Sequence, residues 1–473
     1  MERGDSTRSP VGVRFILPNV ERLAPGVRVN LTSYDTTRRW HVYGQGTVRR
    51  DGRQILPDPE VQFVEVGCIM ILGPTTAPPA VGPRPGPRVG DPVDPATGLF
   101  VLEKTDLVVP DVIPIVWTRT YRPLDGVRAF GQGASHPYNI FLVGDTAAYT
   151  FADLIQADGF KIRYTRISGG TGYADAVMEH TTTPTAWYKS RLTWNTGRPG
   201  WDVTRTDGTV YEFNAPANWP GPMLTGIRDR RGHRLEVERA GPNTRRVARM
   251  RTPHGRWMAF TYDATDRVTQ AKDHAGRVVT YEYDASGRLA AVVDAAGGRT
   301  EYTYNTQDLN GRMATLKDAR GIVFLTNAYD AAGRVTQQTQ ADGTTWQLGY
   351  TLDVDGTIVQ TDVTDPRGYV RRFTFNASGY VLTDTRAFGT PLAQTTTYVR
   401  DSAHRVTSMT DALGRVTAST YDAMGNRLTV TRLAGTPDAV MTTSTYEATF
   451  NQVASGTDPL THTTSSGTTG WGT

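Results

Sequence analysis

The chain has 473 residues with 48 glycines and 28 prolines, a composition that disfavours an all-helical bundle. Its net charge of +4 is too small over this length for the basic footprint of a nucleic-acid-binding protein. Its single cysteine, Cys68, excludes an internal disulfide and a cysteine-based metal site. The sequence contains no apolar run of the ~18 residues that a membrane span needs, and its start lacks the apolar core of a secretory signal.

The first part of the chain predicts a small β domain followed by a spacer. Residues 1–72 contain strand-like alternation at Val29 and Leu31, and again over Trp40–Tyr43. Residues 73–95 contain eight prolines, which is typical of an extended, semi-rigid linker. We therefore predict a domain boundary within this linker.

Residues 96–240 predict an aromatic β module. Apolar and polar residues alternate over Ile115–Tyr121 and Val203–Phe213, and Thr206–Thr209 carries a hairpin-turn signal. Helical periodicity is not evident in this region, so we expect strands throughout.

Three tryptophans in this module follow one another at seven-residue spacing: Trp187, Trp194 and Trp201. Large aromatic residues dominate β cores, so core packing is the main prediction for these side chains. Stacking of their rings on sugar rings is the alternative, which makes them candidate glycan contacts.

Residues 241–460 repeat with a period in the low twenties. A Tyr-Asp pair and an Asp-x-x-Gly run alternate along this region. The candidate turn residues of the repeats are Tyr262, Asp263, Asp273, Gly276, Tyr283, Asp284, Gly287, Arg288, Asp294, Gly297, Tyr329, Asp330, Gly333, Arg334, Asp411, Gly414, Tyr421, Asp422 and Gly425.

One unit, residues 273–294, predicts a two-stranded hairpin. Its two arms should share one apolar face, formed by Val279, Tyr281 and Tyr283, then Leu289, Ala291 and Val293. In the connecting turn the Asp carboxylate accepts backbone N–H groups, and Gly adopts the positive φ that the turn requires. A single hairpin is marginally stable in water, so the units must stack into one long sheet. The predicted fold class is all-β.

The run Tyr-Asp-x-x-Gly-Arg-(Leu/Val), found at Tyr283–Leu289 and Tyr329–Val335, resembles the YD repeat of the RHS (rearrangement hot spot) family. Gly90–Val101 and Thr118–Arg122 resemble the module that precedes the repeats in such proteins. The resemblance covers residues 90 to about 460. It implies a secreted or cell-surface bacterial protein whose repeats spiral into a hollow β shell, which in polymorphic-toxin members encloses a C-terminal toxin.

The end of the sequence departs from the family pattern. The family closes its shell with an Asp-Pro-x-Gly type motif, whereas Asp458–Thr461 reads Asp-Pro-Leu-Thr. We therefore expect residues 461–473 to be a low-complexity tail and the chain to be a partial shell that lacks the closing segment and toxin. The implied partners are that missing segment, and either a secretion machinery or a surface polysaccharide.

The recurring aspartates predict structure more than chemistry, because a carboxylate needed once for catalysis is not repeated at every turn. Calcium binding at these turns is the alternative, although the sequence lacks an Asp-x-Asp-x-Asp run. The histidines lack zinc-ligand spacing, and the sequence contains neither a Gly-x-Ser-x-Gly elbow nor a phosphate-binding Gly-x-x-x-x-Gly-Lys loop. We expect no metal, no cofactor and no enzymatic activity.

Gly-Arg pairs at Arg277, Arg288, Arg334 and Arg415 predict a row of guanidinium groups that face the aspartates of neighbouring turns. A charge-paired, solvated edge is the main interpretation of this row, and a surface for an anionic glycan is the alternative. The sequence thus leaves two functions open. One is the structural part of a toxin-delivery shell, and the other is a repetitive adhesin or carbohydrate-binding protein.

Overall fold

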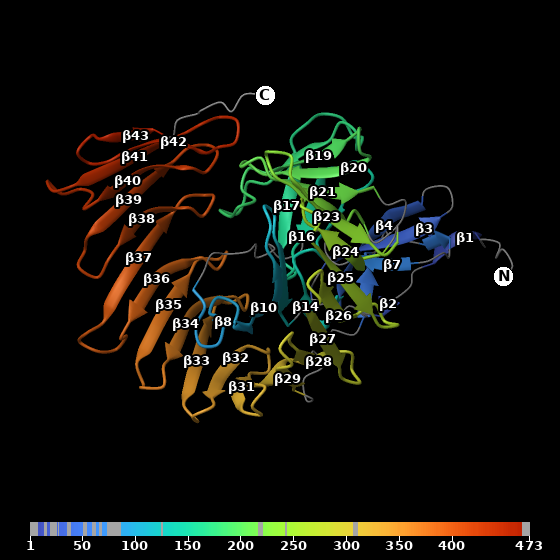
Figure 1. Ribbon diagram of the computed structural model, residues 1–473, viewed down its shortest axis with the longest axis horizontal. Helices are drawn as coiled ribbons and strands as arrows, with labels where there is room; N and C mark the ends of the chain where they lie inside the picture. The colour runs from blue at the N-terminus through green and yellow to red at the C-terminus, as the bar shows by residue number, and fades with distance from the viewer. Residues whose placement is uncertain are drawn as a thin grey trace. The chain divides into compact units, whose positions relative to one another are not determined.

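The structure is a computed structural model, and it describes residues 8–13, 17–18, 26, 28–35, 39–50, 54–58, 63–65, 69–72, 87–123, 126–215, 221–241, 244–305 and 311–465. Every regular element among these residues is a β-strand (Figure 1), which confirms the predicted all-β class. The chain divides into two compact units, residues 1–80 and 81–473. Cys68, residues 73–86 of the proline-rich segment and residues 466–473 of the tail lie outside the described residues.

The first unit contains a five-stranded antiparallel sheet with the order β2-β5-β4-β3-β7, and a separate pair formed by β1 and β6. The alternation at Val29 and Leu31 lies in β3, where both side chains are at most 1% exposed. The strands are β1 (Arg8–Val13), β2 (Leu17–Pro18), β3 (Arg28–Asp35), β4 (Arg39–Val48), β5 (Gln54–Pro57), β6 (Phe63–Glu65) and β7 (Ile69–Leu72).

The second unit begins with short strands, and we call residues 87–140 the lead-in segment. Val89 and Val93 exchange two backbone hydrogen bonds of 3.0 and 2.7 Å, so the last residues of the proline-rich stretch belong to this unit. The strands are β8 (Val93–Asp94), β9 (Leu99–Phe100), β10 (Leu102–Val109), β11 (Ile115–Tyr121), β12 (Val127–Arg128), β13 (Gly131–Gln132) and β14 (Ala134–Ser135).

The rest of the second unit is one antiparallel sheet of 29 strands whose order in space is their order along the chain. The sheet starts at residue 141, so it includes strands on both sides of residue 240. Its strands are β15 (Phe141–Gly144), β16 (Phe151–Ile155), β17 (Lys161–Arg166), β18 (Val177–Glu179), β19 (Arg191–Asn195), β20 (Gly200–Thr204), β21 (Val210–Asn214), β22 (Leu224–Arg228), β23 (Arg234–Arg239), β24 (Val247–Arg251), β25 (Trp257–Tyr262), β26 (Val268–Asp273), β27 (Val278–Tyr283), β28 (Leu289–Val293), β29 (Arg299–Tyr304), β30 (Met313–Lys317), β31 (Val323–Tyr329), β32 (Val335–Gln340), β33 (Thr345–Leu352), β34 (Ile358–Thr364), β35 (Val370–Phe375), β36 (Val381–Arg386), β37 (Gln394–Arg400), β38 (Val406–Thr410), β39 (Val416–Tyr421), β40 (Arg427–Arg432), β41 (Val440–Tyr446), β42 (Val453–Thr457) and β43 (Thr463–Ser465).

A β-bulge corrects the predicted facing of one arm of the hairpin. Tyr283 lies opposite Leu289, but the next residue pair is Glu282 with Ala291, so one residue of β28 is skipped. Val292, only 4% exposed, therefore lies opposite Tyr281. Val293 is only partly buried, and the prediction that it faces the core is wrong. The same register shift occurs beside Tyr262, Tyr329 and Tyr421, where one residue is skipped in the strand that follows the turn. Such bulges increase the local twist of a sheet.

The lead-in segment packs on the buried face of the long sheet and links strands that are distant in sequence. Trp117 is fully buried, and its ring centroid lies 4.1 Å from that of Phe260 in β25. The Gln338 side chain of β32 both accepts the Asp91 N–H at 2.8 Å and donates to the Asp91 carbonyl at 2.7 Å. The Thr361 hydroxyl of β34 donates to the Pro95 carbonyl at 2.6 Å, and Figure 1 shows β8 beside β33 and β34. These contacts join the lead-in segment to a core that continues along the sheet from β15 to β36.

Candidate functional site

The YD turns share one geometry, which the turn between β27 and β28 illustrates. The backbone N–H groups of Ser286 and Arg288 donate to Oδ1 of Asp284, each at 2.9 Å. Nε of Arg288 donates to Oδ2 of the same carboxylate at 2.7 Å. Gly287 has a φ of 79°, a conformation that costs glycine no Cβ clash. The carboxylate therefore ties together the backbone and a side chain of its own turn.

The predicted partners of the turn arginines are wrong, because each arginine pairs with the aspartate of its own turn. The backbone N–H of the arginine already donates to that carboxylate, so its guanidinium lies beside it; Arg405 also reaches the next turn, but there its Nη1 donates to the Asp422 carbonyl at 3.0 Å. The pairs, each with an Nε to Oδ2 distance of 2.7 Å, are Arg267–Asp263, Arg277–Asp273, Arg288–Asp284, Arg334–Asp330, Arg405–Asp401 and Arg415–Asp411.

The repeat tyrosine connects each of several hairpins to the one before it. The guanidinium carbon of Arg288 lies 4.7 Å from the ring centroid of Tyr304, and the Tyr304 hydroxyl donates to the Leu289 carbonyl at 2.8 Å. Arg267 likewise lies 4.4 Å from the Tyr283 ring, whose hydroxyl donates to the carbonyl of residue 268. We call this Asp-Arg-Tyr arrangement the staple. The staples comprise Asp263, Arg267 and Tyr283; Asp284, Arg288 and Tyr304; Asp330, Arg334 and Tyr350; and Asp401, Arg405 and Tyr421.

Within the staples, the pKa of two aspartates is lowered and the pKa of three tyrosines is raised. Partial burial disfavours the charged form of Asp263, but hydrogen bonds from the backbone of Arg267 and from Thr265 lower its pKa overall. Asp330 has a lowered pKa for the same reasons, with Arg334 as the donor. Burial raises the pKa of Tyr283, so its hydroxyl remains protonated and donates to the Val268 carbonyl at 2.5 Å.

Three of the described turns reach the same conformation without glycine, so the pattern Asp-x-x-Gly omits them. Asp266, His404 and Thr461 occupy the glycine position with φ values of 65°, 64° and 69°, and in the last of these turns the N–H groups of Leu460 and His462 donate to Oδ1 of Asp458. Aspartate and histidine tolerate this left-handed region better than most residues. The Tyr-Asp pair at 262–263 identifies the first of these turns from the sequence. In the second turn the residue directly before Asp401 is Arg400 and not a tyrosine, so the pair is missing.

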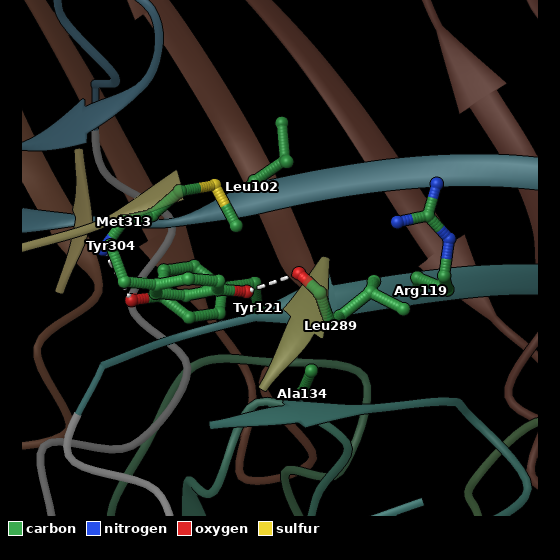
Figure 2. Close-up of a pocket in the computed structure, with 7 residues that line it drawn as sticks. All are labelled: Leu102, Arg119, Tyr121, Ala134, Leu289, Tyr304 and Met313. Carbon is green, nitrogen blue, oxygen red and sulfur yellow. Dashed lines mark hydrogen bonds between the residues drawn. The ribbon is translucent and has the colours of Figure 1, made fainter. Parts of the chain in front are cut away.

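A small pocket lies between the lead-in segment and β28–β30 (Figure 2). Its polar side chains are hydrogen-bonded to the backbone or to other side chains. The Met313 N–H donates to the Tyr121 hydroxyl at 3.0 Å, and the side chain of Arg119 forms two hydrogen bonds with Asp106, of 2.6 and 3.0 Å. None of the lining residues is a histidine, serine, cysteine or acid. The lining consists of Leu102, Arg119, Tyr121, Ala134, Leu289, Tyr304 and Met313.

The three candidate glycan-contact tryptophans pack within the protein. Trp201 is only 7% exposed and lies opposite Trp194, with ring centroids 5.5 Å apart. Trp187 packs against Tyr211 at 4.8 Å. Both Trp187 and Trp194 are partly buried against the core. The rings therefore pack on one another and on the core, and their contact with a glycan stays a prediction.

Within the described ranges, no three histidine, cysteine, aspartate or glutamate residues are grouped as a metal site would require. The part of the chain that the structure describes contains no helix with the length and apolar character of a membrane span.

Comparison with known proteins gives two family matches. The family described as Teneurin YD-shell matches residues 246–449, and a domain of unknown function (DUF6531) matches residues 90–164. No curated protein matches the chain.

Solved structures of low similarity also match. The chain of "Crystal Structure of TcdB2-TccC3-TEV" is 14% identical with a TM-score of 0.35, and the match covers 77% of this chain and 22% of that one. A chain of the Photorhabdus luminescens Tc holotoxin pore is 13% identical with a TM-score of 0.31, covering 91% of this chain and 24% of that one. This chain thus spans about a quarter or less of those chains. The two family matches, together with the repeated turn geometry, show that the chain belongs to the RHS family of YD-repeat proteins.

Proposed function

We propose that this chain forms part of the wall of a secreted or cell-surface bacterial shell that encloses a toxin for delivery to competing cells. In this proposal the chain is structural and performs no catalysis. The observation that carries it is the continuity of the 29-stranded sheet, in which staples tie neighbouring hairpins together. In this proposal the sheet separates the interior of the shell from the surroundings, a role that requires no catalytic centre.

A change in burial along the sheet supports an enclosed cargo. Val363, two residues before the turn residue Asp365, is only 2% exposed. Met409 occupies the same place before Asp411 but is only partly buried. The lead-in segment packs against the earlier strands, whereas the later strands β37–β41 are mostly half-buried or exposed. This less covered face would be available to a segment held inside the shell.

The proposal is tested on the natural full-length gene product that contains this chain. Limited proteolysis in native buffer should leave a toxin segment intact, and denaturant should make that segment cleavable. Gly287→Val, which distorts a stapled turn, should expose the segment, whereas the control Arg320→Ala at an exposed turn should not. Equal cleavage with and without denaturant would contradict enclosure.

Two further assays address delivery and catalysis. Deletion of the gene should reduce killing of a competing strain, and unchanged killing would contradict a role in delivery. Expression of residues 1–473 in a bacterial cytoplasm without an immunity partner should leave growth unchanged. Growth arrest would show that this chain is itself toxic.

A further inference from the structure

His136 is buried in the lead-in segment in an unusual state. Its side chain is 0% exposed, and neither ring nitrogen has a hydrogen-bond partner. The ring lies among aromatic side chains, with its centroid 4.3 Å from Trp117, 6.0 Å from Phe130 and 6.3 Å from Tyr138. We call these three rings the His136 cage. A buried polar group without a partner is rare, and the cage is suited to a neutral imidazole.

The cage is also the joint between the lead-in segment and the long sheet. The Trp117 ring contacts Phe260 of β25, and its Nε1 donates to the Tyr281 hydroxyl of β27 at 2.8 Å. Phe130 lies 4.9 Å from the ring of Tyr281. Displacement of His136 would therefore disturb the contacts that hold the lead-in segment on the sheet.

The charged groups around His136 oppose a further positive charge on its ring. Arg239 of β23 donates to the Tyr138 carbonyl at 2.9 Å, and Arg128 of β12 donates to the Asn139 carbonyl at 2.6 Å. Burial, reinforced by these two arginines, lowers the pKa of His136 well below its ordinary value. Burial raises the pKa of Tyr138 to about 12, so this phenol is neutral. Among the described residues, the charged side chains that act on the imidazole are thus both cations, and the nearby Asp106 bonds instead to Arg119 and Tyr281.

We propose that His136 is an acid-sensitive release group that loosens the lead-in segment from the sheet below about pH 6.5. Protonation would give the ring two N–H donors and no acceptor in a water-excluded cage. Attraction of the cation to the Trp117 face offsets only part of the desolvation cost and of the repulsion from the two arginines. Once His136 is protonated, the free energy therefore favours a state in which the lead-in segment opens and exposes the ring to water. This inference does not depend on the nature of any enclosed cargo.

The sign and size of the effect follow from proton linkage. Because the folded-state pKa of His136 is depressed, the opened state binds the proton more readily, so stability is lost as pH falls below the ordinary value of about 6.5. For one such group, the equilibrium constant for opening should rise about 25-fold between pH 7 and pH 5. A second histidine, His254, also contacts the lead-in segment, where its Nδ1 donates to the Asp111 carboxylate at 2.6 Å.

The test is hydrogen exchange of the full chain at pH 7 and pH 5, corrected for the intrinsic exchange rates. Opening of β10–β14 should increase about 25-fold in the wild-type protein, with little change in β38–β42. His136→Phe should remove most of the increase. His180→Gln is the matched control, since His180 is 1% exposed but both its ring nitrogens have partners, at 2.8 Å to the Arg163 carbonyl and 2.6 Å to the Thr183 hydroxyl. The control should retain the pH response of β10–β14.

Two results would overturn the proposal. One is uniform acid loosening of the whole sheet in the wild-type chain, and the other is an unchanged pH response in folded His136→Phe. If His136→Phe does not fold, the wild-type comparison of β10–β14 with β38–β42 still decides between local release and general acid instability.

Discussion

Gly131 offers the sharpest test of how the lead-in segment docks on the sheet. It forms an isolated backbone bridge with Arg288, and its φ is 85°. A Cβ at this position would overlap the carbonyl oxygen of Gly287, a backbone atom that cannot rotate away. Gly276 has the same φ of 85°, but a Cβ there meets no atom within 4 Å. Comparison of alanine substitutions at the two glycines therefore distinguishes the cost of backbone strain from the cost of losing the contact between the lead-in segment and the sheet.

We expect Gly276→Ala to reduce the free energy of unfolding by about 1 kcal/mol, the cost of a non-glycine residue in the left-handed region. Gly131→Ala should carry that cost and about 2 kcal/mol more, because the bridge to the sheet must shift. Urea denaturation of both variants measures the difference, and hydrogen exchange should locate the additional loss in β10–β14. Equal losses in the two variants would refute the close approach of these two segments.

Four other predictions follow from the staples and from the division of the chain. Gly287→Val should lower the free energy of unfolding by about 3 kcal/mol, more than Arg288→Ala, because a β-branched residue is strained at a φ of 79°; equal losses in thermal denaturation would contradict the turn geometry. Arg288→Ala should in turn destabilise more than Arg415→Ala, since the Arg288 side chain is 17% exposed and stacked on Tyr304, whereas that of Arg415 is 59% exposed. Asp330 has a depressed folded-state pKa, so its contribution should be lost as pH falls below about 4, and Asp330→Asn should flatten that part of the stability curve. Limited proteolysis of the native chain should first separate two fragments near residue 80, and a first cut within residues 262–422 would argue against a continuous sheet.

The turns and strands of the repeats could be predicted from the sequence. The Asp-x-x-Gly runs specify turns because few residues adopt a positive φ, and the alternation between them specifies strands. The bulge after each YD turn was not accessible, since one skipped residue leaves the spacing of the markers unchanged. The partner of Arg288 was wrongly predicted for a related reason: the sequence places it near several aspartates, and only the geometry of the turn, in which its backbone N–H also binds Asp284, selects that residue.

Contacts between distant segments were beyond local pattern reasoning. Asp91 and Gln338, or Trp117 and Tyr281, carry no mutual signal in the sequence, yet their hydrogen bonds fix the lead-in segment on the sheet. His136 was missed because a lone histidine without ligand spacing is usually a turn or surface residue. Its burial depends on how β11 and the strands of the sheet meet around it, which is a tertiary property.

The two kinds of contact imply two ranges of cooperativity in the second unit. A staple joins one hairpin to the next, so its loss should weaken a few neighbouring strands, as in other repeat proteins with nearest-neighbour coupling. The lead-in segment instead bonds to strands as far apart as β25 and β34, and its displacement removes support from all of them together. A change at Gly131 or His136 should therefore loosen more of the sheet than a change at any single staple. The residues whose substitution changes the stability of the most strands therefore lie in the lead-in segment, which packs on the buried face of the sheet, and not in the repeats that form the sheet.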